Sequence, residues 1–422
     1  MPVLRVLDRI TRRYQRLGYL KRVIKRINAT PTSNLDNIGN DLIDAVLRKV
    51  RVQLNDEVVS YIRIRLQDRA YKSLKDQAAL WLKDGEQSTE VQMELQDVYL
   101  ADSALPSQVG KLVKNDWRTY PNLGTNLGLV RAGTYSINTR GLSFLFFTPD
   151  VELQAFQEYI PEHNPFFINQ KQGLLLLFSL IENDGEVVAP LFAKLLRANL
   201  STFNDRDAGD LLPEIYRSII ARYRTRSLAI EFRERLEIIE KSGESIAKSQ
   251  SKNAKEYLGG GAREESSRPR LEPYTDLGFF EKPQKMKYEY TFSNIGRCWA
   301  EAFRGDEDSA AIEEFLARRF FHTAAKAWQI QAHELTAPDE IVPYLQRAAK
   351  AISSSSGYAP IEELALVGGI WALTDDQAIF EPGVARDALI AYQKINPYKV
   401  RFTVDRSGTL AHVRFMDDTS IS

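Results

Sequence analysis

The sequence predicts a mainly α-helical protein with small β-hairpins, arranged as helical bundles and two or three compact units of helix and hairpin. Apolar residues recur at three- and four-residue steps through most of the chain, which is the spacing of one helix face. Short alternating segments next to Gly, Asn and Asp interrupt this pattern and are typical of hairpins. With 422 residues the chain is also too long for one core, and its length suggests about three domains.

Residues 1–90 are predicted to form a basic helical bundle. An apolar stripe runs from Val6 to Ile27 at helical spacing. The first thirty residues contain nine arginines and lysines against one acid, Asp8, although the net charge of the whole chain is zero. Acids concentrate instead between residues 300 and 380. Such polarity is expected when one face of a protein meets phosphates and another meets solvent or a protein partner.

The rest of the chain divides by its pattern. Residues 242–267 lose helical periodicity and contain three consecutive glycines, so we predict a flexible linker there. The segment from Leu211 through Glu240 has a long helical periodicity. The expected order is a first helix–hairpin unit at 91–150, a helical region at 151–241, the linker at 242–267, a second unit at 268–303, and a helical region ending in a third unit at 304–422.

A sequence motif that occurs twice, which we call the internal echo, is the most informative pattern. Leu127-Gly128-Leu129 precedes Tyr135-Ser136-Ile137-Asn138-Thr139-Arg140-Gly141, and Leu277-Gly278-Phe279 precedes Tyr288-Glu289-Tyr290-Thr291-Phe292-Ser293-Asn294-Ile295-Gly296. The glycine of Leu-Gly-Leu can adopt a positive φ and end a helix. The alternating residues that follow predict a returning strand. The final glycine of each copy is expected to begin a further helix or turn.

A third unit is predicted at the C-terminus. Residues 361–372 and 384–394 form two successive helical patterns, each started by a proline. Residues 399–415 alternate around Asp405-Arg406-Ser407-Gly408, which predicts a β-hairpin.

The two echo copies resemble the winged-helix superfamily pattern of Leu-Gly-Leu followed by Tyr-x-Leu-Thr-x-x-Gly. The resemblance implies that the helix before each hairpin approaches double-stranded DNA and that the hairpin, or wing, contacts phosphates. It also implies that some copies dock proteins instead. The nucleic-acid-binding candidates at these places are Arg268, Arg270, Lys282, Lys285 and Lys287 in the second unit, Arg131 and Arg140 in the first, and Lys399, Arg401 and Arg406 in the third.

No enzymatic pattern stands out, and we expect no catalytic residue, cofactor or metal. The four histidines are not grouped with other metal-ligating residues, and His322 and His333 lie too far apart along a helix to share an ion. HExxH, GxSxG and Walker A motifs are absent from the sequence. The single cysteine, Cys298, is expected to be a buried small residue. The tryptophans are scattered and are expected to anchor cores.

The cysteine content and the lack of a long apolar stretch predict a cytoplasmic protein with no membrane segment. Our hypothesis is a non-catalytic DNA-binding component of a multi-protein assembly, in defence or chromosome maintenance, with protein partners or self-association. A structural adaptor, whose winged helices dimerise or clamp a partner ATPase, is one alternative, favoured by the zero net charge. A transcriptional repressor is another. Within the DNA-binding hypothesis, the second unit is expected to contribute more than the first.

Overall fold

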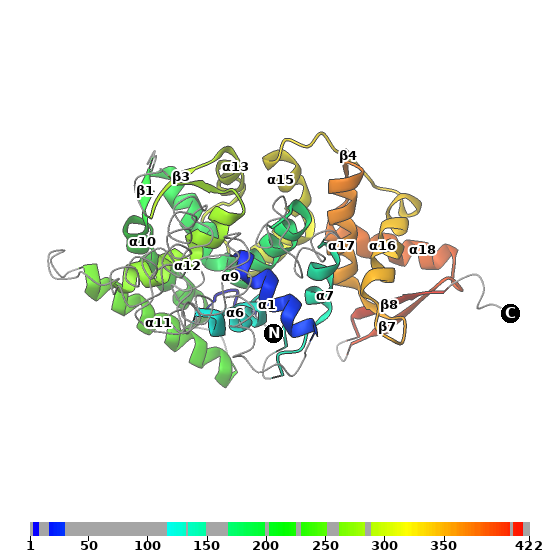
Figure 1. Ribbon diagram of the computed structural model, residues 1–422, viewed down its shortest axis with the longest axis horizontal. Coiled ribbons are helices and arrows are strands. Elements are labelled where there is room, and N and C mark those ends of the chain that lie inside the picture. The colour runs from blue at the N-terminus through cyan, green and yellow to red at the C-terminus, as the bar shows by residue number, and fades with distance from the viewer. Residues whose placement is uncertain are drawn as a thin grey trace, which may run out of the picture. The chain divides into compact units, whose positions relative to one another are not determined.

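The computed structural model describes residues 3–7, 17–29, 116–131, 134–148, 168–198, 202–224, 229–250, 261–282, 288–405 and 408–416 (Figure 1). The chain forms two compact units, a small unit of residues 16–169 and a large unit of residues 1–15 and 170–422. The described residues of both units are mainly helical. Across the described segments, no helix combines the length and apolar character needed to cross a membrane.

In the small unit, helix α1 (Leu17–Ala29) packs against α6 (Asp116–Asn126) and α7 (Thr139–Phe146). The apolar stripe predicted from the sequence forms the contact, because Leu20, Val23 and Ile24 are fully buried. This confirms one helix of the expected N-terminal bundle. The remainder of that bundle, residues 30–90, lies outside the described residues.

The large unit is organised around α9 (Gln170–Arg197), a helix of 28 residues that continues through Pro190. Its leucine run at residues 174–177 is completely buried. Two acids on the same helix, Asp184 and Glu186, are buried as well. Because a buried carboxylate is costly unless it is paired, these two positions require partners from other elements.

The helices after α9 correct one prediction. The periodic segment at residues 211–240 lies in two helices, α10 (Asp205–Arg224) and α11 (Ile230–Gln250). The linker expected at 242–267 is wrong for the residues that are described there. Residues 242–250 belong to α11 and residues 262–267 to α12 (Ala262–Asp276), and Ile246 is fully buried. Residues 251–260 lie outside the described residues.

The hairpin after α12 and a short strand before α10 form a three-stranded sheet that packs on aromatic side chains. It contains β1 (Phe203–Asn204), β2 (Phe280–Glu281) and β3 (Glu289–Phe292) in the antiparallel order β1-β3-β2. Phe192 of α9 meets the ring of Phe280 edge to face, with 5.3 Å between centroids. The next helix, α13 (Asn294–Ala302), buries Trp299 against Phe279, as expected for a core anchor.

The internal echo is confirmed as a repeated backbone arrangement. Gly128 ends its helix with φ +69° and Gly278 with φ +82°. The residue after each glycine donates its N–H to the helix, from Leu129 to the Gly124 carbonyl at 2.8 Å and from Phe279 to the Tyr274 carbonyl at 2.9 Å. Both copies therefore leave the helix in the same way.

The same equivalence holds where the next helix begins. Asn138 caps α7 and Ser293 caps α13, each accepting a hydrogen bond at 3.0 Å from the backbone N–H of a glycine three residues later, Gly141 or Gly296. Side-chain acceptors at this position satisfy an otherwise unpaired helix N–H. The final glycine of each pattern thus starts a helix rather than a turn.

The C-terminal part of the large unit is a cluster of helices bearing a hairpin. Its elements are α14 (Ser309–Arg318), α15 (Phe320–Ala327), β4 (His333–Glu334), α16 (Pro338–Ile352), β5 (Ala359–Pro360), α17 (Ile361–Asp375), β6 (Ala378–Ile379), α18 (Pro382–Ile395), β7 (Val400–Val404) and β8 (Leu410–Phe415). β4 and β6 pair in parallel. β5, β7 and β8 form an antiparallel sheet in the order β5-β8-β7. The predicted hairpin and the two helices before it are confirmed.

The two three-stranded sheets share one topology. In each, the first strand precedes a helix and pairs with the last strand, which also pairs with the middle strand. β1 and β5 are the first strands, and β2–β3 and β7–β8 are the hairpins. We call residues 338–416 the C-terminal module and residues 170–302 the central module.

Candidate nucleic-acid interface

The hairpin of the C-terminal module has one buried face and one exposed face. Val400 and Val413 are fully buried, and Phe402 lies opposite Val413 in the register. Because side chains alternate across a strand, these three residues share the inner face. Arg401 and its cross-strand neighbours must therefore share the outer face.

The outer face of this hairpin is cationic. Arg401 lies directly opposite Arg414, and Thr403 lies opposite His412. Arg401 and His412 are exposed, and Arg414 is half-buried against Gly357. Within the described part of the chain, neither arginine forms an ion pair with an acid. Like charges placed directly opposite each other destabilise a sheet, so an anionic ligand on this face would relieve a repulsion.

Charge is segregated within the C-terminal module. The described residues from Pro382 to Met416 carry five arginines and lysines against two acids, a formal charge of +3. The preceding helices, residues 338–375, carry two arginines and lysines against five acids, a formal charge of −3. The cations are Arg386, Lys394, Lys399, Arg401 and Arg414. The positive half of the module is therefore the half that contains α18 and the hairpin.

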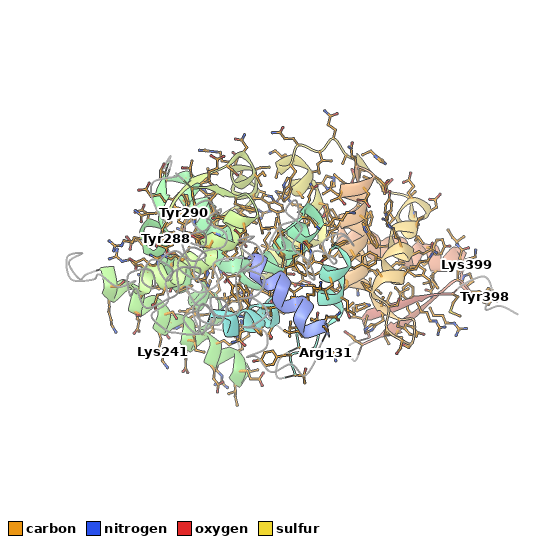
Figure 2. The ribbon with its side chains drawn as sticks, in the orientation of Figure 1. Arg131, Lys241, Tyr288, Tyr290, Tyr398 and Lys399 are labelled. Carbon is orange, nitrogen blue, oxygen red and sulfur yellow. The ribbon has the colours of Figure 1, made fainter. Side chains whose placement is uncertain are left out.

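The turn between α18 and β7 belongs to this positive half. Figure 2 shows Tyr398 and Lys399 beside each other at the end of α18. The Lys399 N–H donates to the Asn396 carbonyl at 3.0 Å, which closes the turn. Lys399, a predicted site residue, is half-buried and Arg401 is exposed. Arg406 lies outside the described residues.

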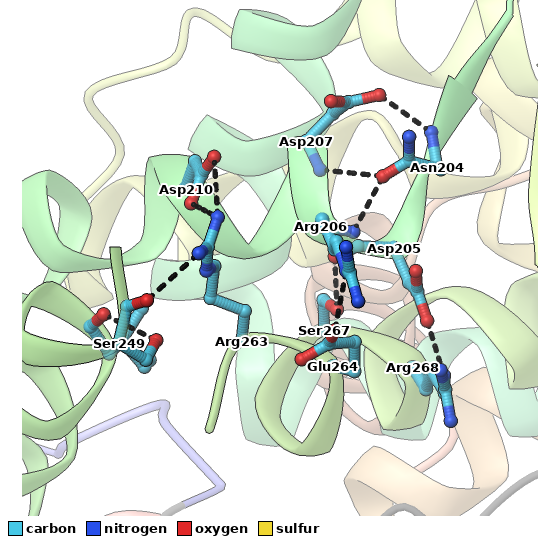
Figure 3. Close-up of polar contacts among 11 residues, drawn as sticks. Asn204, Asp205, Arg206, Asp207, Asp210, Ser249, Arg263, Glu264, Ser267 and Arg268 are labelled. Carbon is cyan, nitrogen blue, oxygen red and sulfur yellow. Dashed lines mark hydrogen bonds and ion pairs between the residues drawn. The ribbon is translucent and has the colours of Figure 1, made fainter. Parts of the chain in front are cut away.

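The cations of α12 in the central module are arranged differently, because acids of the same unit engage them. Arg268 pairs with Asp205 and stacks on the ring of Tyr288 at 3.7 Å. Arg263 of the same helix pairs with Asp210 at 3.1 Å. Figure 3 shows these pairs between α12 and the start of α10. The side chain of Arg268 is only 15% exposed. Its charge therefore stabilises the fold through the ion pair with Asp205 and is largely inaccessible to a ligand.

Arg270, expected to face DNA, is instead a core residue with 2% exposure. Its Nε donates to Asp184 at 2.6 Å and its Nη2 to the other oxygen of the same carboxylate at 3.1 Å. The remaining N–H groups donate to the Tyr216 hydroxyl and to the carbonyls of Ser266 and Leu7, each at 3.0 Å. Burial lowers the pKa of Arg270, but Asp184 and Tyr216 together raise it above its ordinary value, so the guanidinium stays charged. We exclude Arg270 from the interface.

Lys282 is also held inside the fold. Its Nζ donates to Glu272 of α12 at 2.6 Å, and the hydroxyl of Tyr290 donates to the same carboxylate at 2.6 Å. Burial, reinforced by Glu272, raises the pKa of Tyr290, which therefore remains a neutral donor. Lys282 thus fixes the base of the β2–β3 hairpin against α12. The predicted site residues Lys285 and Lys287 lie outside the described residues.

The small unit offers one exposed candidate. Arg131 follows Val130, which forms an antiparallel bridge with Ile137, and its side chain is exposed (Figure 2). Arg140 is buried in α7 with 8% exposure and packs back toward Gly128. We therefore also exclude Arg140 from the interface, since the residue is buried.

A groove of about 730 Å³ between α10 and α11 was not expected from the sequence. Its lining includes the apolar Ile220 and Tyr216 and an ion pair between Arg224 and Glu240. Its rim carries both signs of charge, so the groove does not select an anion. Among the described residues, no three His, Cys, Asp or Glu side chains are placed to hold a metal ion.

His322 contacts the residue that precedes α18. Its Nδ1 lies 2.8 Å from the Glu381 carboxylate, which also accepts the backbone N–H groups of Phe321 and His322. The hydrogen bond with Glu381 raises the pKa of His322 above its ordinary value of 6.5, although burial opposes this. Glu334 is the other acid beside the ring, at 3.9 Å.

This contact predicts a pH dependence of stability. A histidine whose pKa is raised on folding stabilises the protein below its unfolded pKa, and the gain disappears as the pH rises through the folded pKa. We expect the melting temperature to fall as the pH rises above the ordinary histidine pKa of 6.5 and through the raised pKa of His322, and His322→Gln to flatten this change. The ring is 46% exposed, so screening limits the effect to about 1 kcal/mol or less. His412→Gln is the control; equal flattening by both variants would contradict the assignment.

Comparisons with known proteins give no relative for this chain: no family model, no curated protein and no solved structure matches it.

Proposed function

We propose that this chain is a non-catalytic winged-helix protein that binds the phosphate backbone of double-stranded DNA as one component of a larger assembly. The observation that carries the proposal is the outer face of the β7–β8 hairpin, where Arg401 lies opposite Arg414 without an acidic partner in the described part of the chain. Phosphate contacts by arginines supply much of the affinity of DNA-binding proteins.

The topology of the C-terminal module supports this assignment. Two successive helices, α17 and α18, precede a two-stranded hairpin, and a short strand before α17 completes the sheet. In the winged-helix arrangement the helix before the hairpin enters a groove and the hairpin contacts the adjacent backbone. Here α18, the turn after it and the hairpin hold five of the seven described cations of the module, so both contacting elements have the charge that the proposal requires.

The side chains of α18 favour binding without base specificity. Its exposed positions include Val384, Asp387 and Lys394, and this set lacks the paired arginine and asparagine typical of base recognition. Duplex binding is therefore expected to depend strongly on salt and weakly on sequence.

Charge reversal on the hairpin tests the proposal. We expect Arg401→Glu combined with Arg414→Glu to weaken binding of a labelled blunt duplex on the order of tenfold or more, because two phosphate contacts become repulsions. Anisotropy titration at low salt measures the loss. Circular dichroism checks that the variant is folded.

A matched control reverses two lysines elsewhere. Lys241 (Figure 2) and Lys248 lie on α11 and are each 78% exposed, with Glu237 at 4.0 Å from Lys241 and Glu244 at 3.7 Å from Lys248. Reversing both changes the net charge by the same amount. Equal loss of binding in both variants would show that affinity follows the overall charge and would contradict an interface on the hairpin.

A protein adaptor is the second candidate function, and the central module favours it. Each of its described candidate cations, Arg268, Arg270 and Lys282, is paired with an acid of the same unit. A module whose charges are satisfied internally suits contact with protein better than contact with phosphate. If the unaltered chain binds no duplex at low salt, the DNA proposal fails and the adaptor function is favoured.

A further inference from the structure

Two large apolar side chains are exposed at the end of the proposed DNA-contacting helix. Ile395 is the last residue of α18 and is 76% exposed, and Tyr398 in the following turn is 78% exposed. The turn is ordered by two backbone hydrogen bonds, one at 2.8 Å from Asn396 to Tyr392 and one at 3.0 Å from Lys399 to Asn396. The two side chains are therefore presented by a defined structure.

The surroundings of these two side chains are cationic. Lys394 precedes Ile395 and is exposed, Lys399 follows Tyr398, and Arg401 begins the outer face of the hairpin. Among residues 394–401 there is no acid. A ligand that complements this edge must carry negative charge together with a flat apolar surface. Nucleic acid combines both, in its phosphates and in the faces of its bases.

An intact duplex does not satisfy both requirements, because its base faces are covered by stacking. Bases become available where the strands separate or where the duplex is unstacked by an inserted side chain. The arginines of the hairpin lie beyond Lys399 along the chain, so a duplex held by them would place its end or an interruption near Tyr398. The edge formed by Ile395 and Tyr398 therefore fits the boundary between paired and unpaired DNA.

We infer that the chain recognises duplex DNA adjoining unpaired bases, with Tyr398 stacking on an unpaired base and Ile395 packing beside it. This inference rests on the proposed function, since the duplex portion is held by Arg401 and Arg414. Tyr398 supplies affinity for the base face and not for the phosphate. Stacking of one base on an aromatic side chain raises affinity between about fivefold and 150-fold.

The experiment compares three labelled ligands at one salt concentration: a blunt duplex, the same duplex with a short unpaired flap, and that duplex with an abasic flap. The two flaps carry the same number of phosphates, so their ratio measures contact with bases. We expect the unaltered chain to bind the base-bearing flap at least fivefold more tightly than the abasic flap. Tyr398→Ala should abolish this ratio and change blunt-duplex affinity less than twofold.

Two further variants identify the interaction. Tyr398→Phe should keep the preference, because stacking needs the ring and not the hydroxyl. Ile230→Ala removes another exposed apolar side chain, 68% exposed at the start of α11, and should keep the preference as well. Equal affinity for the two flaps, or a preference that survives Tyr398→Ala, would overturn the inference. The blunt duplex separates the claims: if it binds through the hairpin arginines while the flaps are equivalent, only this inference fails.

Discussion

Gly296→Ala is expected to destabilise the large unit by about 3 kcal/mol, because there is no room for the added methyl group. A Cβ at this position would lie 2.1 Å from the carbonyl oxygen of Phe279 and 2.9 Å from its carbonyl carbon. Both atoms are backbone and cannot move without breaking the turn between α12 and β2. Urea denaturation followed by fluorescence of the neighbouring Trp299 measures the effect.

A glycine-to-alanine change inside a helix does not usually destabilise a protein, so a second glycine is an informative control. Alanine normally stabilises the interior of a helix by about 0.5–1 kcal/mol relative to glycine. Gly243 of α11 has its nearest neighbour, a ring atom of Tyr216, at an ordinary 3.4 Å. Gly243→Ala should therefore be neutral or stabilising. A Gly296→Ala protein as stable as the unaltered chain would contradict the packing of α13 against the backbone of Phe279.

The second large effect is expected at the buried pair of Asp184 and Arg270. Arg270→Met or Asp184→Ala alone should cost about 3–5 kcal/mol, because each leaves one charge buried without its partner. Either substitution would also break a hydrogen-bond network that joins α9, α10, α12 and the backbone of Leu7. The N–H of Leu7 donates to Asp184 at 2.9 Å in this network.

A double-mutant cycle identifies the interaction. The combined Asp184→Ala and Arg270→Met protein should lose clearly less than the sum of the single changes, because neither charge is then left unpaired. Thermal unfolding of the four proteins gives the coupling. Additive losses would show that the two side chains do not depend on each other.

Local patterns predicted the helices and hairpins well because those features depend on nearby residues. The stripe of α1, the prolines before α17 and α18, and the alternation around Gly408 are all readable within one element. The echo was also readable, since both copies need glycine at the same two places. One of these glycines has positive φ, and the other lies against a carbonyl oxygen.

The site was predicted less well because ion pairing connects residues distant in sequence. Arg268 and Arg270 follow one another on α12 like the cations of a DNA-contacting helix, yet their partners are 63 and 86 residues earlier. One signal was present: Asp184 interrupts an apolar run in α9, and a buried acid requires a cation. The linker prediction failed for a similar reason, since the part of α11 inside residues 242–250 is highly polar and buries one large apolar side chain, Ile246, which continues the buried side begun by Leu236 and Ile239.

The central claim, that the hairpin arginines contact DNA phosphates, is tested most directly by the salt dependence of duplex binding. The logarithm of the association constant falls linearly with the logarithm of salt concentration, with a slope of about 0.9 per phosphate contacted. We predict a linear, negative dependence for the unaltered chain and a slope smaller by about two for Arg401→Glu combined with Arg414→Glu. An unchanged slope in that variant would contradict the claim.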